Sequence, residues 1–180
     1  MPAAEVRIDL TLNDRIVDLA DEGYELAIRV GPLADSGLVA RMLAPFHTVA
    51  CASPAYLARD GKPKTPRDLT GHNCLIFSYA TRGHLWPFQG PSGKQTITIK
   101  VSLQINSGAA LRMAALEGLG IIMQPQAMVA EDIAAGRLAR VLPRYESPPR
   151  SMHIVYLPDR RLSPKLRSFI DFLIERFGDD

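Results

Sequence analysis

The clearest pattern of hydrophobic and polar positions lies in the middle of the chain. Apolar and polar residues alternate over 97–105, which predicts a β-strand. Asn106 and Ser107 are residue types that cap helix N-termini, and a helical pattern follows from about 108–117. Glycines end that helix, and a short apolar strand over 121–123 comes next. This stretch therefore predicts a strand, a helix and a second strand.

The start of the chain has the same kind of pattern. Residues 6–12 alternate like a strand, 15–22 carry an apolar stripe at helical spacing, and 24–31 resemble a second strand. Gly23 is placed to end the helix. The first thirty residues therefore predict a βαβ unit, which favours a parallel sheet.

The remaining elements are shorter. Serine or threonine followed by proline begins three helices, after Ser53, Thr65 and Ser163. A turn-rich segment, 80–95, predicts a hairpin, and 127–135 predicts a short helix. We expect further strands over 38–43, 46–52, 74–79, 138–142 and 152–157. Alternating strands and helices indicate the α/β class.

Composition narrows the class of protein. The 180 residues are 47% apolar and 22% charged, as in ordinary soluble domains. The net charge is +2 without a long basic run, which argues against a nucleic-acid-binding surface. The N-terminus lacks a secretory pattern, and no apolar stretch reaches the length of a membrane span. We therefore expect a cytoplasmic protein without membrane contact, with Cys51 and Cys74 as buried thiols rather than a disulfide.

The chain shows no signature of an enzyme. Residues 90–94 match a phosphate-binding loop only in part, because Phe88 and Gln95 stand where the motif needs glycine and a hydroxyl residue. The histidines and cysteines have no zinc-ligand spacing, and no nucleophile elbow is present. We expect a binding protein with no catalytic residues, no metal and no cofactor.

The capped helix after 97–105 is the first candidate for a binding site. Ligands of open α/β sheets bind beyond the carboxyl ends of strands, and a helix N-terminus favours an anion. Asn106 and Ser107 either serve such a ligand or only cap the helix.

Four segments together resemble the effector-binding domain of LysR-type transcriptional regulators. They are DLADEGYELAIRVGPLADSGLVARMLAPFHTVACASPAYLARDGKPKTPRDLTGHNCL, NSGAALRMAALEGLGIIMQP, AAGRLARVLP and RRLSPKLRSFIDFL, in the order of that family. The resemblance implies a periplasmic-binding-protein-like fold of type 2, with two α/β lobes joined by two crossover strands. Residues 1–48 and 153–180 would form one lobe and 49–152 the other. A small effector would bind between the lobes.

Two features of the family are missing from the chain. Without the family's N-terminal winged helix-turn-helix and linker helix, we expect DNA binding only through a domain that is absent here. The family's effector domain also begins with one more strand and helix, so the first lobe would be incomplete at its N-terminus. That would leave a sheet edge unpaired, which predicts marginal stability or self-association into a homodimer or higher oligomer.

The resemblance also suggests effector-binding positions at strand ends, at the hinge and at the central helix. Arg29 either pairs with an acidic ligand or makes an ion pair within the protein, and Ser53 either contacts the ligand or only caps a helix. Trp86 either packs in the core or closes over the ligand. The candidates are Asn13, Asp14, Arg29, Val30, Gly31, Ser53, Asn106, Ser107, Gly108 and Gln124.

The sequence thus predicts the ligand-sensing and dimerisation domain of a LysR-type regulator, with a small effector for which the helix N-terminus favours an anion. Two alternatives remain open. One is a free-standing solute-binding protein of a transport system, which shares the fold. The other is a regulatory fragment that oligomerises with a full-length relative and inactivates it.

Overall fold

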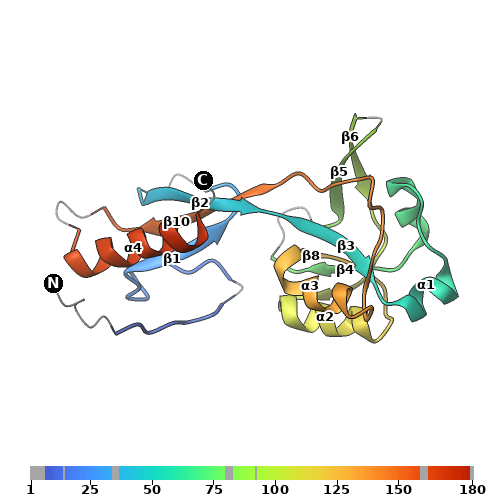
Figure 1. The fold of residues 1–180 in the computed structure, drawn as a ribbon, viewed down its shortest axis with the longest axis horizontal. Coiled ribbons are helices and arrows are strands. Elements are labelled where there is room, and N and C mark those ends of the chain that lie inside the picture. The colour runs from blue at the N-terminus through green and yellow to red at the C-terminus, as the bar shows by residue number, and fades with distance from the viewer. Residues whose placement is uncertain are drawn as a thin grey trace. The chain divides into compact units, whose positions relative to one another are not determined.

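A computed structural model describes residues 7–13, 15–33, 37–79, 83–91, 93–158 and 162–178. The chain divides into two compact units, which we treat separately (Figure 1). The first unit comprises Met1–Phe46 and Arg150–Asp180, and the second comprises His47–Pro149. The two lobes expected from the sequence, 1–48 with 153–180 and 49–152, stay a prediction.

The first unit is built on an antiparallel sheet of three strands in the order β1-β10-β2. The strands are β1 (Leu26–Val30), β2 (Val39–Phe46) and β10 (Arg150–Tyr156). Helix α4 (Pro164–Phe177) lies along this sheet (Figure 1). Its buried Ile170 and Leu173 belong to one apolar cluster with Leu43, Ile154 and Tyr156 of the strands. The helix expected after Ser163 is therefore confirmed, and it packs on the sheet by one apolar face.

The βαβ unit expected in the first thirty residues is wrong. Residues 7–13 form no strand, and Leu10 and Leu12 are 75% and 87% exposed. Strand β1 instead pairs antiparallel with β10. A strand needs a neighbouring strand to pair with, and none of the described residues pairs with 7–13. The alternating pattern alone is therefore not enough to make this segment a strand.

The helix expected over 15–22 is also absent, and residues 19–23 form turns. The Asp18 carboxylate accepts the backbone N–H groups of Ala20 and Asp21, at 2.9 and 3.1 Å. Arg15 and Glu22 form an ion pair across the segment, with nitrogen and oxygen 2.5 Å apart. Local bonds from aspartate compete with helical hydrogen bonds, which explains the turn.

The second unit contains a five-stranded sheet in the order β7-β4-β8-β3-β9. Strand β4 runs parallel to both β7 and β8, whereas β3 runs antiparallel to β8 and β9. The central strand–helix–strand prediction is confirmed here, with α2 joining β7 to β8. The bounds are β3 (Thr48–Ala52), β4 (Cys74–Phe77), β7 (Val101–Ile105), α2 (Gly108–Leu116), β8 (Ile121–Pro125) and β9 (Ala139–Arg140).

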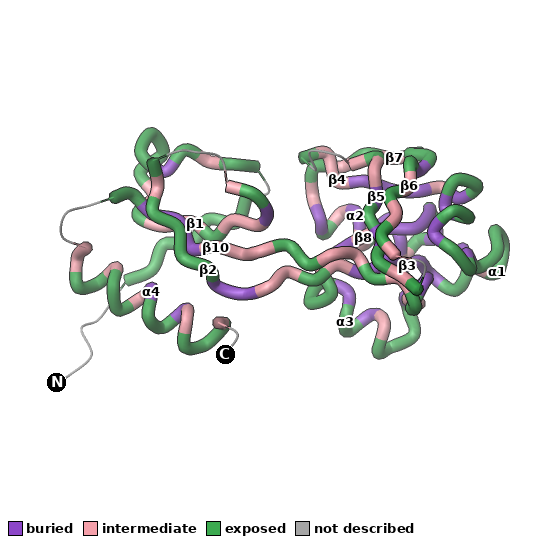
Figure 2. Tube along the Cα trace, turned by 90° about the horizontal axis from the view of Figure 1, so that it is seen from above, coloured by how far each residue is buried: buried purple, intermediate pink, exposed green. Residues whose placement is uncertain are grey.

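Two apolar clusters fill the second unit. One joins the sheet to α2 and to α3 (Gln126–Ala134), through residues such as Leu111 and Val129. The other contains Tyr56 of α1 (Pro54–Asp60) and Leu69 of η1 (Pro66–Gly71). Buried positions accordingly gather along the strands of this unit (Figure 2). In the parts of the chain that the structure describes, no helix combines the length and apolar character of a membrane span.

The strand expected over 97–105 is interrupted. Strands β5 (Leu85–Gly90) and β6 (Gly93–Thr98) form the expected hairpin, and β7 begins only at Val101. In the two residues between β6 and β7, the Ile99 N–H donates to the His84 carbonyl, and the Lys100 carbonyl accepts the N–H of Cys74. The chain therefore leaves the hairpin and joins the main sheet within two residues, without a change in its apolar alternation. Trp86 is only 5% exposed and packs in the core.

Several local predictions are confirmed. The hydroxyls of Ser53, Ser107 and Ser163 each accept a backbone N–H in the first turn of their helices, at 3.2–3.3 Å. Gly118 follows α2 with a φ of +75°, the left-handed conformation expected for a residue that ends a helix. Cys51 and Cys74 are buried free thiols, and burial raises the pKa of each to about 12.

Candidate functional site

The parallel strands β4, β7 and β8 end at the same edge of the second unit's sheet. The residues at this edge either follow a strand directly or are among its last residues. The ends of β4 and β7 are joined there, because the Ser78 N–H donates to the Ile105 carbonyl, at 2.8 Å. Open α/β sheets bind ligands at such an edge. We call this group the C-terminal edge, and it consists of Ser78, Tyr79, Asn106, Ser107, Gly108 and Gln124.

Helix α2 begins at the C-terminal edge. Ser107 has the extended backbone of an N-cap, and its Oγ accepts the Ala110 N–H at 3.3 Å. A helix N-terminus presents backbone N–H groups and a partial positive charge, which stabilise an anion. The local sequence thus gives this edge an electropositive character without a basic side chain.

Gln124 of β8 lies against the start of α2. A Cβ placed on Gly108 would stand 3.5 Å from Gln124 Oε1 and 3.2 Å from the Cε of Met128. The Gln124 side chain is 4% exposed, so its amide is held in this environment. The structure therefore brings together Asn106, Ser107, Gly108 and Gln124 from the predicted set.

Two apolar residues at this edge escaped the sequence analysis. Tyr79 is 52% exposed and meets the Phe77 ring edge-on, with centroids 5.7 Å apart. Met128, in the first turn of α3, is 40% exposed beside Gly108. Neither had a usable signal, because each looks like an ordinary apolar position near the end of an element. Together with the helix N-terminus they suit a small anion with an apolar portion.

Ser53 does not join this group. It caps α1, is 3% exposed, and its Oγ stands 3.4 Å from a Cβ placed on Gly118. Gly118 lies just past the C-terminus of α2, roughly 14 Å along that helix from its start. Ser53 therefore lies at the other end of α2 from Ser107.

The remaining candidates belong to the first unit and make local contacts. The Asn13 side chain accepts the Arg15 N–H at 3.0 Å, and Arg29 donates to the Val17 carbonyl at 2.6 Å. The Val30 carbonyl accepts a bond from Arg150 at 3.2 Å. Asp14 lies outside the described residues.

Gly31 has a φ of +99° and donates its N–H to the Ser151 carbonyl. A Cβ at this position would stand 2.8 Å from the Arg150 guanidinium. The left-handed φ favours glycine here, whereas the Arg150 guanidinium is a flexible tip that can move aside. A role of Gly31 in ligand binding stays a prediction.

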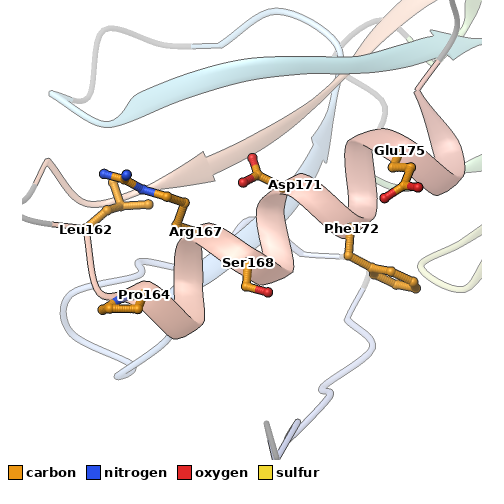
Figure 3. Close-up of a pocket in the computed structure, with 7 residues that line it drawn as sticks. All are labelled: Leu162, Pro164, Arg167, Ser168, Asp171, Phe172 and Glu175. Atoms are coloured by element: carbon orange, nitrogen blue, oxygen red, sulfur yellow. The ribbon is translucent and has the colours of Figure 1, made fainter. Parts of the chain in front are cut away.

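A shallow depression runs along α4 in the first unit (Figure 3). Its side chains spread outward from α4 and from Leu162 just before it, and the Asp171 carboxylate pairs with Arg41, at 3.7 Å. None of the predicted site residues lines it. It carries both signs of charge and offers no strand ends, so we do not treat it as the candidate site. The lining residues are Leu162, Pro164, Arg167, Ser168, Asp171, Phe172 and Glu175.

The charged side chains of the second unit also include one buried cluster. Asp132 of α3 is fully buried and bonds Arg112 at 2.5 Å and Arg137 at 2.7 Å. The hydrogen bond from Arg112, with a further one from Arg137, lowers the pKa of Asp132. These bonds tie α2 to α3 and to the turn after α3, so the cluster holds the helices that frame the C-terminal edge. Among the described residues, no three His, Cys, Asp or Glu side chains are placed to hold a metal ion.

Comparison with known proteins identifies the family. A family model described as the LysR substrate binding domain matches residues 2–178, so the chain belongs to that family. The YhjC protein of Escherichia coli K12, an HTH-type transcriptional regulator, is 38% identical over 93% of this chain and 57% of its own length. DmlR of the same organism, also an HTH-type regulator, is 35% identical over 99% of this chain and 57% of its own. The chain thus spans just over half the length of these curated relatives.

Solved structures of LysR-type regulators also resemble this chain. The regulatory domain of CrgA from Neisseria meningitidis, a LysR-type regulator, aligns with a TM-score of 0.78 and 34% identity. The alignment covers 88% of this chain and 78% of that domain. These regulatory domains have the periplasmic-binding-protein-like fold of type 2, so the predicted family and fold class are confirmed. The relatives are regulators, which counts against a transport protein.

Proposed function

We propose that this chain is the effector-sensing part of a LysR-type transcriptional regulator and that it works by binding rather than catalysis. The observation that supports this most directly is the C-terminal edge, where Ser107, Gly108 and Gln124 meet in a chain of this family. The regulator would act in the cytoplasm, where its DNA lies. DNA contact would be made by a helix-turn-helix segment outside these 180 residues, as the names of the relatives suggest.

The effector we propose is a small organic anion with an apolar portion. Its carboxylate would accept bonds at the N-terminus of α2, and the Gln124 amide would orient it. Its apolar portion would lie against Tyr79 and Met128, which are both exposed. The candidates of the first unit, Asn13, Asp14 and Arg29–Gly31, remain proposed contacts.

Binding would alter the regulator by favouring one of two conformations. A ligand shifts such an equilibrium only by the difference in its affinity for the two states. We further propose that the chain self-associates as a homodimer or higher oligomer, which would transmit the change to DNA.

The experiment is a thermal-shift screen of the purified chain with matched pairs of ligands. Each pair consists of a small carboxylic acid and its neutral carboxamide. A ligand that binds only the folded state adds about 2.7 kcal/mol to the free energy of unfolding at one hundred times its Kd. We expect concentration-dependent stabilisation by some acids and none by their amides. Stabilisation by amides and acids alike would contradict the anionic site.

A further inference from the structure

A second concave surface lies elsewhere in the second unit. It is a groove of about 310 Å³ formed by two connecting segments. One segment joins α1 to η1, and the other follows β9. We call it the basic groove, and its lining residues are Lys62, Pro63, Lys64, Leu142, Pro143, Arg144 and Tyr145.

The basic groove combines three cations with an apolar floor. Lys62, Lys64 and Arg144 are exposed, and within the described residues none of their side chains forms an ion pair. No carboxylate lines the groove. The acids nearest in sequence are Asp60, which pairs with Arg59 at 2.7 Å, and Glu146, which is exposed and does not line the groove. Asp68 accepts the N–H groups of Lys64 and Thr65, at 2.8 and 3.0 Å, so its charge is engaged in capping η1.

The wall that follows β9 is fixed by the surrounding structure. Leu142 is buried in a left-handed conformation with φ +54°, the only such described residue that is not glycine. Its carbonyl accepts the Tyr145 N–H, at 2.9 Å. The Tyr145 ring packs so closely on Gly90 that a Cβ there would stand 2.3 Å from it. The groove is therefore formed before any partner arrives, which lowers the ordering cost of binding.

We propose that the basic groove docks an acidic peptide segment of a partner protein. Charge complementarity carries the proposal, because three unpaired cations from two segments surround a floor of proline, leucine and tyrosine. An extended peptide that alternates acidic and apolar side chains would satisfy both features. Leu142 and Tyr145 of the groove pack with the apolar cluster that includes Tyr56 and Leu69. That cluster covers the face of the sheet away from α2 and α3. The partner would thus use a different surface from the effector.

Fluorescence anisotropy tests the proposal with the whole chain. The probe is a short fluorescein-labelled peptide of alternating glutamate and leucine, and its control replaces glutamate by glutamine. The groove variant combines Lys62→Glu, Lys64→Glu and Arg144→Glu. The matched variant combines Lys94→Glu, Lys100→Glu and Lys165→Glu, which changes the net charge equally at exposed positions outside the groove.

We expect the acidic probe to bind and the glutamine probe to bind more weakly. The groove variant should lose about tenfold in affinity, since each ion pair contributes modestly, while the matched variant changes little. Equal losses in both variants would show attraction to net charge alone and overturn the proposal. Absence of binding to the wild-type chain, or equal binding of a DNA oligonucleotide of the same charge, would also overturn it. Thermal melts of both variants establish that they fold, and carboxylate stabilisation measured on the same samples tests the effector site separately.

Discussion

Gly108 lies against Gln124, since a Cβ on the glycine would be in van der Waals contact with the glutamine Oε1, at 3.5 Å. This contact joins the first residue of α2 to a residue near the end of β8. The two residues are sixteen positions apart in the sequence. Gly108 has no left-handed conformation, so backbone strain does not require glycine here. Gln124 and the tip of Met128 therefore lie directly beside the first residue of α2 at the C-terminal edge.

Gly108→Ala should separate binding from stability. Alanine is a better helix former, and the atom nearest to its Cβ is the flexible tip of Met128, 3.2 Å away. We expect the free energy of unfolding to change by less than about 1 kcal/mol. In the proposed site the ligand lies against Gly108, so the added methyl group should lower effector affinity by about tenfold, or 1.4 kcal/mol. Urea unfolding and ligand titration measure the two quantities. Unchanged affinity would place the effector elsewhere.

Asp132→Asn should destabilise the chain strongly. The buried carboxylate holds Arg112 and Arg137, and asparagine leaves both guanidinium groups without a counter-ion. Removing one partner of a buried ion pair costs about 3 kcal/mol. Chemical denaturation measures this cost. The control is Asp60→Asn, because Asp60 pairs with Arg59 on the exposed surface and should contribute little.

The same carboxylate predicts how stability depends on pH. Hydrogen bonds from Arg112 and then Arg137 lower the pKa of Asp132 below the ordinary aspartate value. The stabilisation is therefore complete above about pH 4, the pKa of an unfolded aspartate, and is lost as the pH falls through the lower folded pKa. Unfolding free energies measured between about pH 6 and pH 3 should fall less steeply in Asp132→Asn than in the wild type. Identical slopes would show that Asp132 does not titrate in this way.

The sequence predicted the elements of the second unit well and those at the start of the chain poorly. Around α2 the signals were local, because Ser107 caps the helix and Gly118 ends it. Residues 7–13 have an equally good strand pattern, but a strand also depends on a partner that pattern cannot supply. The site shows the same division. Ser107 and Gly108 follow from local sequence, whereas the position of Ser53 at the far end of α2 and the contact of Met128 depend on tertiary packing.

Gly120→Ala tests the packing at the end of the sheet opposite the C-terminal edge, where β4 and β8 begin. A Cβ at this position would stand 2.5 Å from the backbone carbonyl of Asn73, and backbone atoms cannot move aside cheaply. We expect a loss of about 3 kcal/mol in unfolding free energy. Gly71→Ala is the matched control, because nothing lies within 4 Å of its Cβ and its φ is not left-handed. Equal effects of the two substitutions, measured by urea unfolding, would contradict the close approach of Gly120 to Asn73.

Ile28→Lys should reduce self-association. Strand β1 is an edge strand of the described sheet, and Ile28 is 48% exposed on it. The Gly31 N–H donates to the Ser151 carbonyl of β10. In an antiparallel pair, successive N–H groups of a strand point alternately toward and away from its partner, so the N–H of Ile28, three residues earlier, points away from β10. Such an edge pairs readily with another chain, and lysine blocks that pairing. Sedimentation velocity should show a shift toward monomer for Ile28→Lys, but not for Leu119→Lys, a similarly exposed control. A wild-type chain that is monomeric and melts cooperatively at high temperature would contradict the predicted self-association.

The most direct test of the effector site compares two helix caps. Ser107 and Ser163 accept first-turn N–H groups at 3.3 and 3.2 Å, so replacing either by alanine should cost about 1 kcal/mol of stability. Only Ser107 lies at the C-terminal edge. Thermal stabilisation by the carboxylate found in the screen should therefore fall severalfold in Ser107→Ala and stay unchanged in Ser163→Ala. If both variants keep the full stabilisation, the effector does not bind at the N-terminus of α2 and the central claim fails.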